Sequence, residues 1–158
     1  MSTSSTDPVL VLALGNPLRG DDGVAQCVLQ ALAQEPLGAG VKLLDGGIAG
    51  LETVTLLQGW ARAVILDAAD FGAPAGTVRR IDLHRNSRRA LPAPSNSLHT
   101  AGLLEALALA DALGTLPGRL TLVGVQPAHI DFECGLSLAV TRAIPEAVGA
   151  VLAALAES

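Results

Sequence analysis

Short apolar runs alternate with longer helical patterns along this chain. Several runs are apolar at successive positions, which is typical of strands that helices cover on both faces. The alternation predicts the α/β class: a three-layer αβα sandwich around a mostly parallel, twisted, five-stranded sheet. The strands are expected at Val9–Leu14, Val41–Leu44, Ala63–Leu66, Thr77–Leu83 and Leu120–Val125.

Four other segments show the spacing of helices. In the first of them, apolar residues recur every four positions, so Gln26 and Gln30 are expected to face solvent. In the last, Pro145 removes one backbone donor, which predicts a kink. The helices are expected from about Asp21 or Asp22, over Leu51–Leu57, from about Thr100 to Leu113, and from about Ser137 to Ala156.

The polar segment His84–Ser97 is interpreted as a long connection, so we expect a single domain over residues 1–158 with a flexible N-terminus at residues 1–8. The first eight residues, MSTSSTDP, lack the basic and apolar regions of a secretory signal. No apolar run approaches the ~20 residues of a membrane helix. A cytoplasmic protein with no membrane partner is therefore expected, with Cys27 and Cys134 as free thiols.

The acidic composition argues against a nucleic-acid partner. The formal net charge is −5 at pH 7, and two Phe, one Trp and no Tyr leave little aromatic surface for stacking on bases. The basic residues form one small cluster, which falls in an expected loop: Arg79, Arg80, Arg85, Arg88 and Arg89.

Glycines and acids follow the expected strands. The run GNPLRGDDG, residues 15–23, follows the first strand, Asp45-Gly46-Gly47 follows the second, and Asp67 ends the third. In an open α/β sheet, ligands bind beyond the carboxyl ends of the strands. These residues are therefore the first candidates for chemistry.

Each acid also has a purely structural interpretation. One of Asp21 and Asp22 would serve as a helix N-cap, while the other would project into a cleft. Asp67 would bond the backbone of a neighbouring loop, and Asp45 would shape the turn that its two glycines form. Sequence spacing leaves both interpretations open for these residues.

Among the three histidines, His99 stands just before the third expected helix, whereas His84 and His129 are expected to face solvent. The dipole at a helix start favours a neutral imidazole, which is the form that binds metals. One imidazole and two carboxylates suit a borderline divalent ion such as nickel or zinc. No HExxH or CxxC spacing supports a metal site independently.

Several of these blocks, in this order, resemble the hydrogenase maturation proteases. The similarity runs from about Val9 to Leu155, and the GNPLRGDDG block is its most specific part. Ala25 departs from the pattern, since many relatives have glycine there. The matching blocks are Val11–Val24, Asp45-Gly46-Gly47 with Gly50, Asp67, Ser97-Leu98-His99 with Gly102-Leu103, Val123–Pro127 and Gly135-Leu136-Ser137.

The resemblance implies a phosphorylase/hydrolase-like fold and an endopeptidase of the aspartic or metal-dependent type. Such an enzyme removes a C-terminal extension from the large-subunit precursor of a nickel-iron hydrogenase after nickel insertion. The family's metal-contacting and catalytic positions match Asp22, Asp67 and His99 here. The resemblance also implies that the precursor delivers the nickel and that no organic cofactor is used.

Two points of the implied mechanism stay open. Either the metal or a carboxylate of Asp21 or Asp22 activates the attacking water. The groove for the substrate tail is expected to be lined by Asn16, Asp45, Gly46 and Gly47.

Some of these residues also allow other interpretations. Gly15-Asn16-Pro17 also resembles peptidyl-tRNA hydrolases of the same general fold, but those have an early histidine and a basic face, and here His84 is the first histidine. A non-cleaving nickel-dependent chaperone of hydrogenase would use the same residues as a protease. A dinucleotide site is disfavoured because residues 15–23 lack the GxGxxG pattern and carry two acids.

Overall fold

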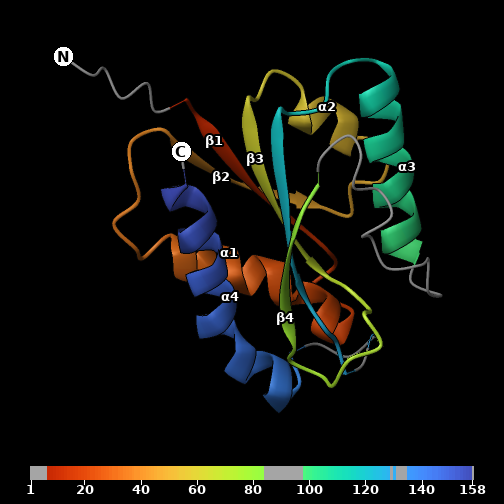
Figure 1. Cartoon of the computed structure of the whole chain (residues 1–158). Coiled ribbons are helices and arrows are strands. Elements are labelled where there is room, and N and C mark those ends of the chain that lie inside the picture. The colour runs from red at the N-terminus through yellow and green to blue at the C-terminus, as the bar shows by residue number, and fades with distance from the viewer. Residues whose placement is uncertain (1–6, 84–97, 129, 131–134, 158) are drawn as a thin grey trace.

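A computed structural model describes residues 7–83, 98–128, 130 and 135–157, with the backbone alone for residues 98–101. Five strands form one sheet in the order β2-β1-β3-β5-β4. All neighbouring strands are parallel except β4, which is antiparallel to β5 (Figure 1). This confirms the predicted mostly parallel sheet. The strands are β1 Val9–Leu14, β2 Val41–Gly47, β3 Arg62–Ala68, β4 Val78–Asp82 and β5 Arg119–Val125.

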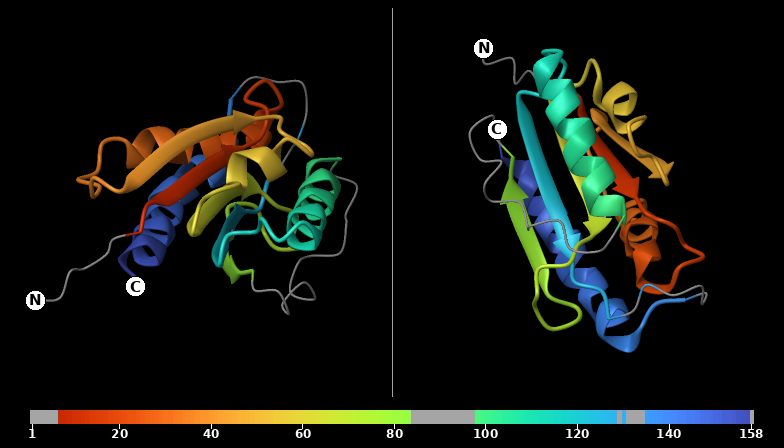
Figure 2. Two further views of the ribbon diagram at one scale, coloured as in Figure 1. Left: turned by 90° about the horizontal axis from the view of Figure 1, so that it is seen from above. Right: turned by 90° about the vertical axis from the view of Figure 1, so that its right-hand side faces the viewer.

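Helices cover both faces of the sheet, as Figure 2 shows from above. Side chains alternate across the strands, so Val64 and Leu66 pack with α1 and α4, whereas Ala63 and Ile65 pack with α2 and α3. The three-layer αβα architecture is therefore confirmed. The helices are α1 Val24–Leu32, α2 Thr53–Leu57, α3 Leu98–Ala112 and α4 Leu138–Ala156, and a 3₁₀ turn, η1, spans Gly20–Gly23.

Three of the differences between predicted and observed element boundaries concern the candidate residues. Strand β2 extends to Gly47 because Asp45 and Gly47 still pair with β1. Helix α1 begins at Val24, after η1, and its N-cap position is Gly23, so the prediction that Asp21 or Asp22 caps it is wrong. Helix α3 begins at Leu98, so His99 lies in its first turn rather than before it.

Helix α4 is long and apolar enough to cross a membrane by length and composition, which corrects the expectation that no apolar run has that length. Its buried side chains pack in the core with α1 and the sheet, whereas Arg142 and Glu146 are exposed. Ser137 caps its first turn, where the Ser137 hydroxyl accepts the Val140 N–H at 3.4 Å. The helix continues through Pro145.

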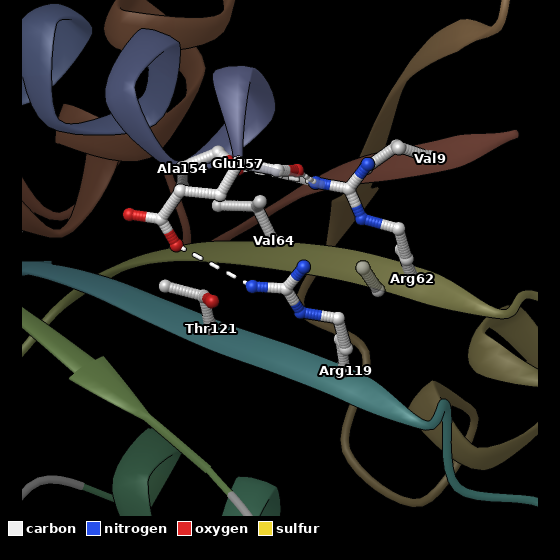
Figure 3. Close-up of a pocket in the computed structure, with 8 residues that line it drawn as sticks. Val9, Arg62, Val64, Arg119, Thr121, Ala154 and Glu157 are labelled. Atoms are coloured by element: carbon white, nitrogen blue, oxygen red, sulfur yellow. Dashed lines mark hydrogen bonds and ion pairs between the residues drawn. The ribbon is translucent and has the colours of Figure 1, made fainter. Parts of the chain in front are cut away.

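The C-terminal end of α4 is anchored by arginines at the amino ends of the parallel strands (Figure 3). Arg62 donates to the carbonyls of Ala154 at 3.2 Å and Glu157 at 2.6 Å. Arg80, which lies in β4 within the expected strand Thr77–Leu83, makes a two-pronged ion pair with Glu157 at 2.6 and 2.5 Å. The hydrogen bonds from Arg80 lower the pKa of Glu157. These contacts fix the C-terminal end of α4, whereas Arg79 lies over the Phe71 ring at 5.1 Å from its centroid, and Arg85, Arg88 and Arg89 lie outside the described residues.

Candidate active site at the carboxyl ends of the strands

The predicted residues lie where the parallel strands end. In the right-hand view of Figure 2, the arrowheads of β1, β2, β3 and β5 point to the same end of the molecule, where α3 and α4 begin. The loop after β1, the end of β3 and the first turn of α3 therefore share one edge. These segments carry Asp22, Asp67 and His99, respectively.

Asp22 is held by a tightly folded loop. Its side chain is 1% exposed, and its Oδ2 accepts the Asn16 N–H at 2.8 Å. The loop needs its glycines, because a Cβ on Gly15 would overlap the Asp22 carbonyl, and one on Gly23 would lie 2.8 Å from Pro17 Cα. The GNPLRGDDG sequence therefore fixes a buried carboxylate directly after β1.

Asp67 is the second buried carboxylate at this edge. It lies near the end of β3, pairs in register with Gly124 of β5, and is 4% exposed. By the strand's alternation it shares the face of Ala63 and Ile65, which α2 and α3 cover. Since η1 contacts β3, the elements that carry Asp22 and Asp67 are neighbours.

The backbone of α3 brings His99 to the same edge. A Cβ on Gly102, in the second turn of α3, would lie 3.7 Å from Gly50 Cα in the loop after β2. The direction of the His99 imidazole lies outside what the structure describes. Among the described side chains, no group of three or more His, Cys, Asp and Glu residues is arranged to hold a metal.

Asp21 has a different role from Asp22. Its Oδ2 accepts the Ala128 N–H and the Ser137 hydroxyl, each at 2.8 Å, and its Oδ1 accepts the Ser137 N–H at 2.7 Å. The carboxylate therefore fixes the chain after β5 and the start of α4 against η1. These contacts give Asp21 a structural role.

Asp45, Gly46 and Gly47 form a β-bulge at the end of the edge strand β2. Ala13 pairs with Asp45 and Leu14 with Gly47, so Gly46 is the extra residue. A Cβ on Gly46 would lie 2.9 Å from side-chain carbons of Leu12 and Leu14. The exposed Asp45 accepts the Gly47 N–H at 2.9 Å, which matches the turn-shaping interpretation.

Gln26 joins this bulge to the loop of Asp22, and the sequence interpretation missed it. The side chain is 7% exposed, so the prediction that it faces solvent is wrong. Its Nε2 donates to the Gly15 carbonyl at 2.9 Å and to Asp45 Oδ1 at 3.2 Å. Helical side chains lean toward the N-terminus, so a glutamine in the first turn can reach the preceding loop.

Gln126 and Phe71 build the wall beside Asp67, and the sequence did not single out Phe71. Gln126 is 6% exposed, and its Oε1 accepts the backbone N–H groups of Phe71 at 2.6 Å and Ala73 at 3.3 Å. A Cβ on Gly124 would overlap the Phe71 ring. The glycine that pairs with Asp67 therefore makes room for this ring.

The remaining predicted residues take no part in the described site. Cys27 is a free, half-buried thiol whose pKa is raised by burial. His84, His129, Cys134 and the expected flexible N-terminus up to residue 6 lie outside the described residues.

The chain is similar to proteins of known family. The family model described as hydrogenase maturation protease matches residues 27–154. The chain belongs to the hydrogenase maturation protease family. This membership confirms the resemblance and decides against the peptidyl-tRNA hydrolase alternative.

Individual members of this family match with different coverage. The hydrogenase 2 maturation protease of Escherichia coli is 36% identical over 153 residues, covering 95% of this chain and 92% of that protein. The hydrogenase expression/formation protein HupD of Thiocapsa roseopersicina is 40% identical over 128 residues, which span 80% of this chain but only 58% of HupD. The solved structure of the E. coli hydrogenase maturating endopeptidase HybD has a TM-score of 0.84 at 33% identity, covering 94% of this chain and 91% of that one.

Proposed function

We propose that this chain is an endopeptidase that removes the C-terminal extension from the nickel-loaded large-subunit precursor of a nickel-iron hydrogenase. The observation that carries the proposal is the placement of buried Asp22 and Asp67 on neighbouring elements at the strand ends. Support comes from the E. coli hydrogenase 2 maturation protease, which this chain matches over 92% of that protein's length. The cytoplasmic location stays a prediction.

Nickel enters this proposal as part of the substrate. Two carboxylates and one imidazole, from Asp22, Asp67 and His99, are a fitting donor set for a borderline divalent ion. The precursor would supply the remaining ligands, so docking would require a loaded substrate. A bound divalent ion can polarise a carbonyl or lower the pKa of a bound water.

The chain's own acids suffice for the proton transfers of amide hydrolysis. A carboxylate that accepts a proton from water lets the hydroxide add to the scissile carbonyl carbon, and the proton then passes to the leaving amine. Asp22 is our candidate for this step, as the alternative to water activation by the metal, because the described contacts of Asp21 are to the backbone and hydroxyl of other segments. The bulge at Asp45–Gly47 and the turn at Asn16 would flank the extended tail.

The test is the mass of the large subunit after incubation with the purified protein. We expect nickel-loaded precursor to lose the mass of its extension and nickel-free precursor to keep its full mass. An unchanged mass of the loaded precursor together with a stable complex would overturn the peptidase in favour of a non-cleaving chaperone. Equal cleavage of loaded and nickel-free precursor would overturn the role of nickel and leave the peptidase standing.

A further inference from the structure

Three large apolar side chains project into solvent beside the candidate site. Leu18 is 67% exposed, Ile48 64% and Leu51 57%. They lie in the loops that follow β1 and β2, and we call them the apolar rim. Elsewhere in the described chain, Leu109, Leu113 and Leu138 are the other exposed large apolar residues. An apolar group at the edge of a site is commonly a contact surface.

The two loops of the apolar rim are fastened to each other. The Gly15 N–H donates to the Gly47 carbonyl at 2.9 Å, and Gln26 bonds the Gly15 carbonyl and Asp45. The apolar rim therefore lies on two loops that hydrogen bonds join, one following the bulge of β2 and the other leading to Asp22.

Local hydrogen bonds also fix the backbone at two of the apolar rim residues, Leu18 and Leu51. The Leu18 N–H donates to Asn16 Oδ1 at 3.0 Å, so Leu18 stands at the tip of a closed turn. The Leu51 carbonyl accepts the Val54 N–H at 3.1 Å, at the entrance of α2. A surface whose backbone is already ordered loses little conformational entropy when a partner binds.

The size and the position of the apolar rim indicate which kind of partner binds there. A stable dimer needs about 800 Å² of buried surface on each partner, which three side chains cannot provide. An extended peptide that passes Asp22, in contrast, would lay its side chains on this rim. The exposed carboxylates of Asp45 and Glu52 beside it disfavour an acidic peptide.

We propose that Leu18, Ile48 and Leu51 bind apolar side chains of the precursor's C-terminal extension next to the scissile bond. The inference rests on the proposed function, because it names the part of that substrate which the site selects. It makes the loops after β1 and β2 the determinants of substrate affinity, separate from the acids that carry the chemistry.

The test compares two double variants by quantitative mass spectrometry of precursor cleavage. Leu18→Ser with Ile48→Ser removes most of the apolar rim. Leu109→Ser with Leu113→Ser removes two other leucines, 42% and 60% exposed, at the C-terminal end of α3 and just beyond it. Burial of one such side chain changes affinity about 10-fold or more. We expect the rim variant to raise KM at least about 10-fold with kcat within about 2-fold, and the control variant to match the wild type.

Each other outcome has one meaning, provided that thermal unfolding shows both variants folded. A rim variant whose KM matches that of the control would overturn the inference and leave the peptidase intact. A wild-type protein that does not cleave precursor would overturn the proposed function instead. A wild-type dimer that becomes monomeric in the rim variant, measured by sedimentation, would assign the rim to a second copy of the chain and overturn the inference.

Discussion

Replacement of Asp21 by Asn tests the division of labour between the two adjacent acids. The wild-type carboxylate accepts three hydrogen bonds, from Ala128 and from the N–H and hydroxyl of Ser137. An asparagine has one acceptor oxygen and turns an NH₂ group toward at least one of these donors. The variant therefore leaves a half-buried N–H without an acceptor and removes the negative charge that strengthens the others.

The expected loss follows from these contacts. A hydrogen bond to a charged group contributes about 1.5–3 kcal/mol, and an unsatisfied donor costs about 1–3 kcal/mol. Asp21→Asn should therefore lower the free energy of unfolding by about 2–4 kcal/mol. For a chain of this length each kcal/mol corresponds to about 2–4 °C, so the melting temperature should fall by about 5–15 °C.

Asp22→Asn is the matched control for this prediction. Its amide oxygen can still accept the Asn16 N–H, so the melting temperature should fall by less than half as much. Processing of the precursor should nevertheless stop in Asp22→Asn and persist, below the melting temperature, in Asp21→Asn. A stable but inactive Asp21→Asn protein, measured by calorimetry and precursor mass, would refute the assignment of Asp21 to a structural role.

Three further substitutions test contacts that stabilise the fold. Gly46→Ala should lower the free energy of unfolding, measured by urea titration, by about 1–3 kcal/mol, because the new methyl group lies against two leucines of β1. An unchanged urea midpoint would show that the bulge accommodates a methyl group. Gln26→Leu should lower the free energy of unfolding by about 1–3 kcal/mol, because the Gly15 carbonyl loses its hydrogen-bond donor. Gln30→Leu, at an exposed position, should change the free energy of unfolding by less than about 0.5 kcal/mol in the same titration. Glu157→Gln should lower the melting temperature at pH 7. Arg80 holds the pKa of Glu157 below its ordinary value. The melting-temperature difference between the wild type and Glu157→Gln should therefore disappear as the pH falls from about 4.3 through that lower pKa. A difference that stays constant down to about pH 3 would contradict a stabilising ion pair.

The strands and the edge that carries the acids could be predicted because they depend on local signals. Residues Val9–Leu14 and Leu120–Val125 are apolar on both faces, and strands buried between helices need that pattern. The parallel arrangement then requires that residues following different strands meet at one edge. This reasoning made Asp21, Asp22, Asp45 and Asp67 candidates, and the family resemblance then selected Asp22 and Asp67.

The errors came from contacts between segments that are distant in sequence. Asp21 looked like a helix cap, but its partners Ala128 and Ser137 are more than 100 positions away, and no local pattern encodes them. Gln26 lies opposite the apolar positions of α1, yet the loop before the helix folds over that face. The bulge at Gly46 depends on how β2 packs against leucines of β1, which two consecutive glycines alone do not specify.

The central claim is that the two buried acids at the end of the sheet carry out the processing of the precursor. The most direct measurement is the intact mass of nickel-loaded precursor after incubation with Asp67→Asn, whose folded state is verified by its thermal transition. We predict that the precursor keeps its full mass, while the wild type removes the extension completely in the same time. Cleavage by folded Asp67→Asn at the wild-type rate would contradict the claim.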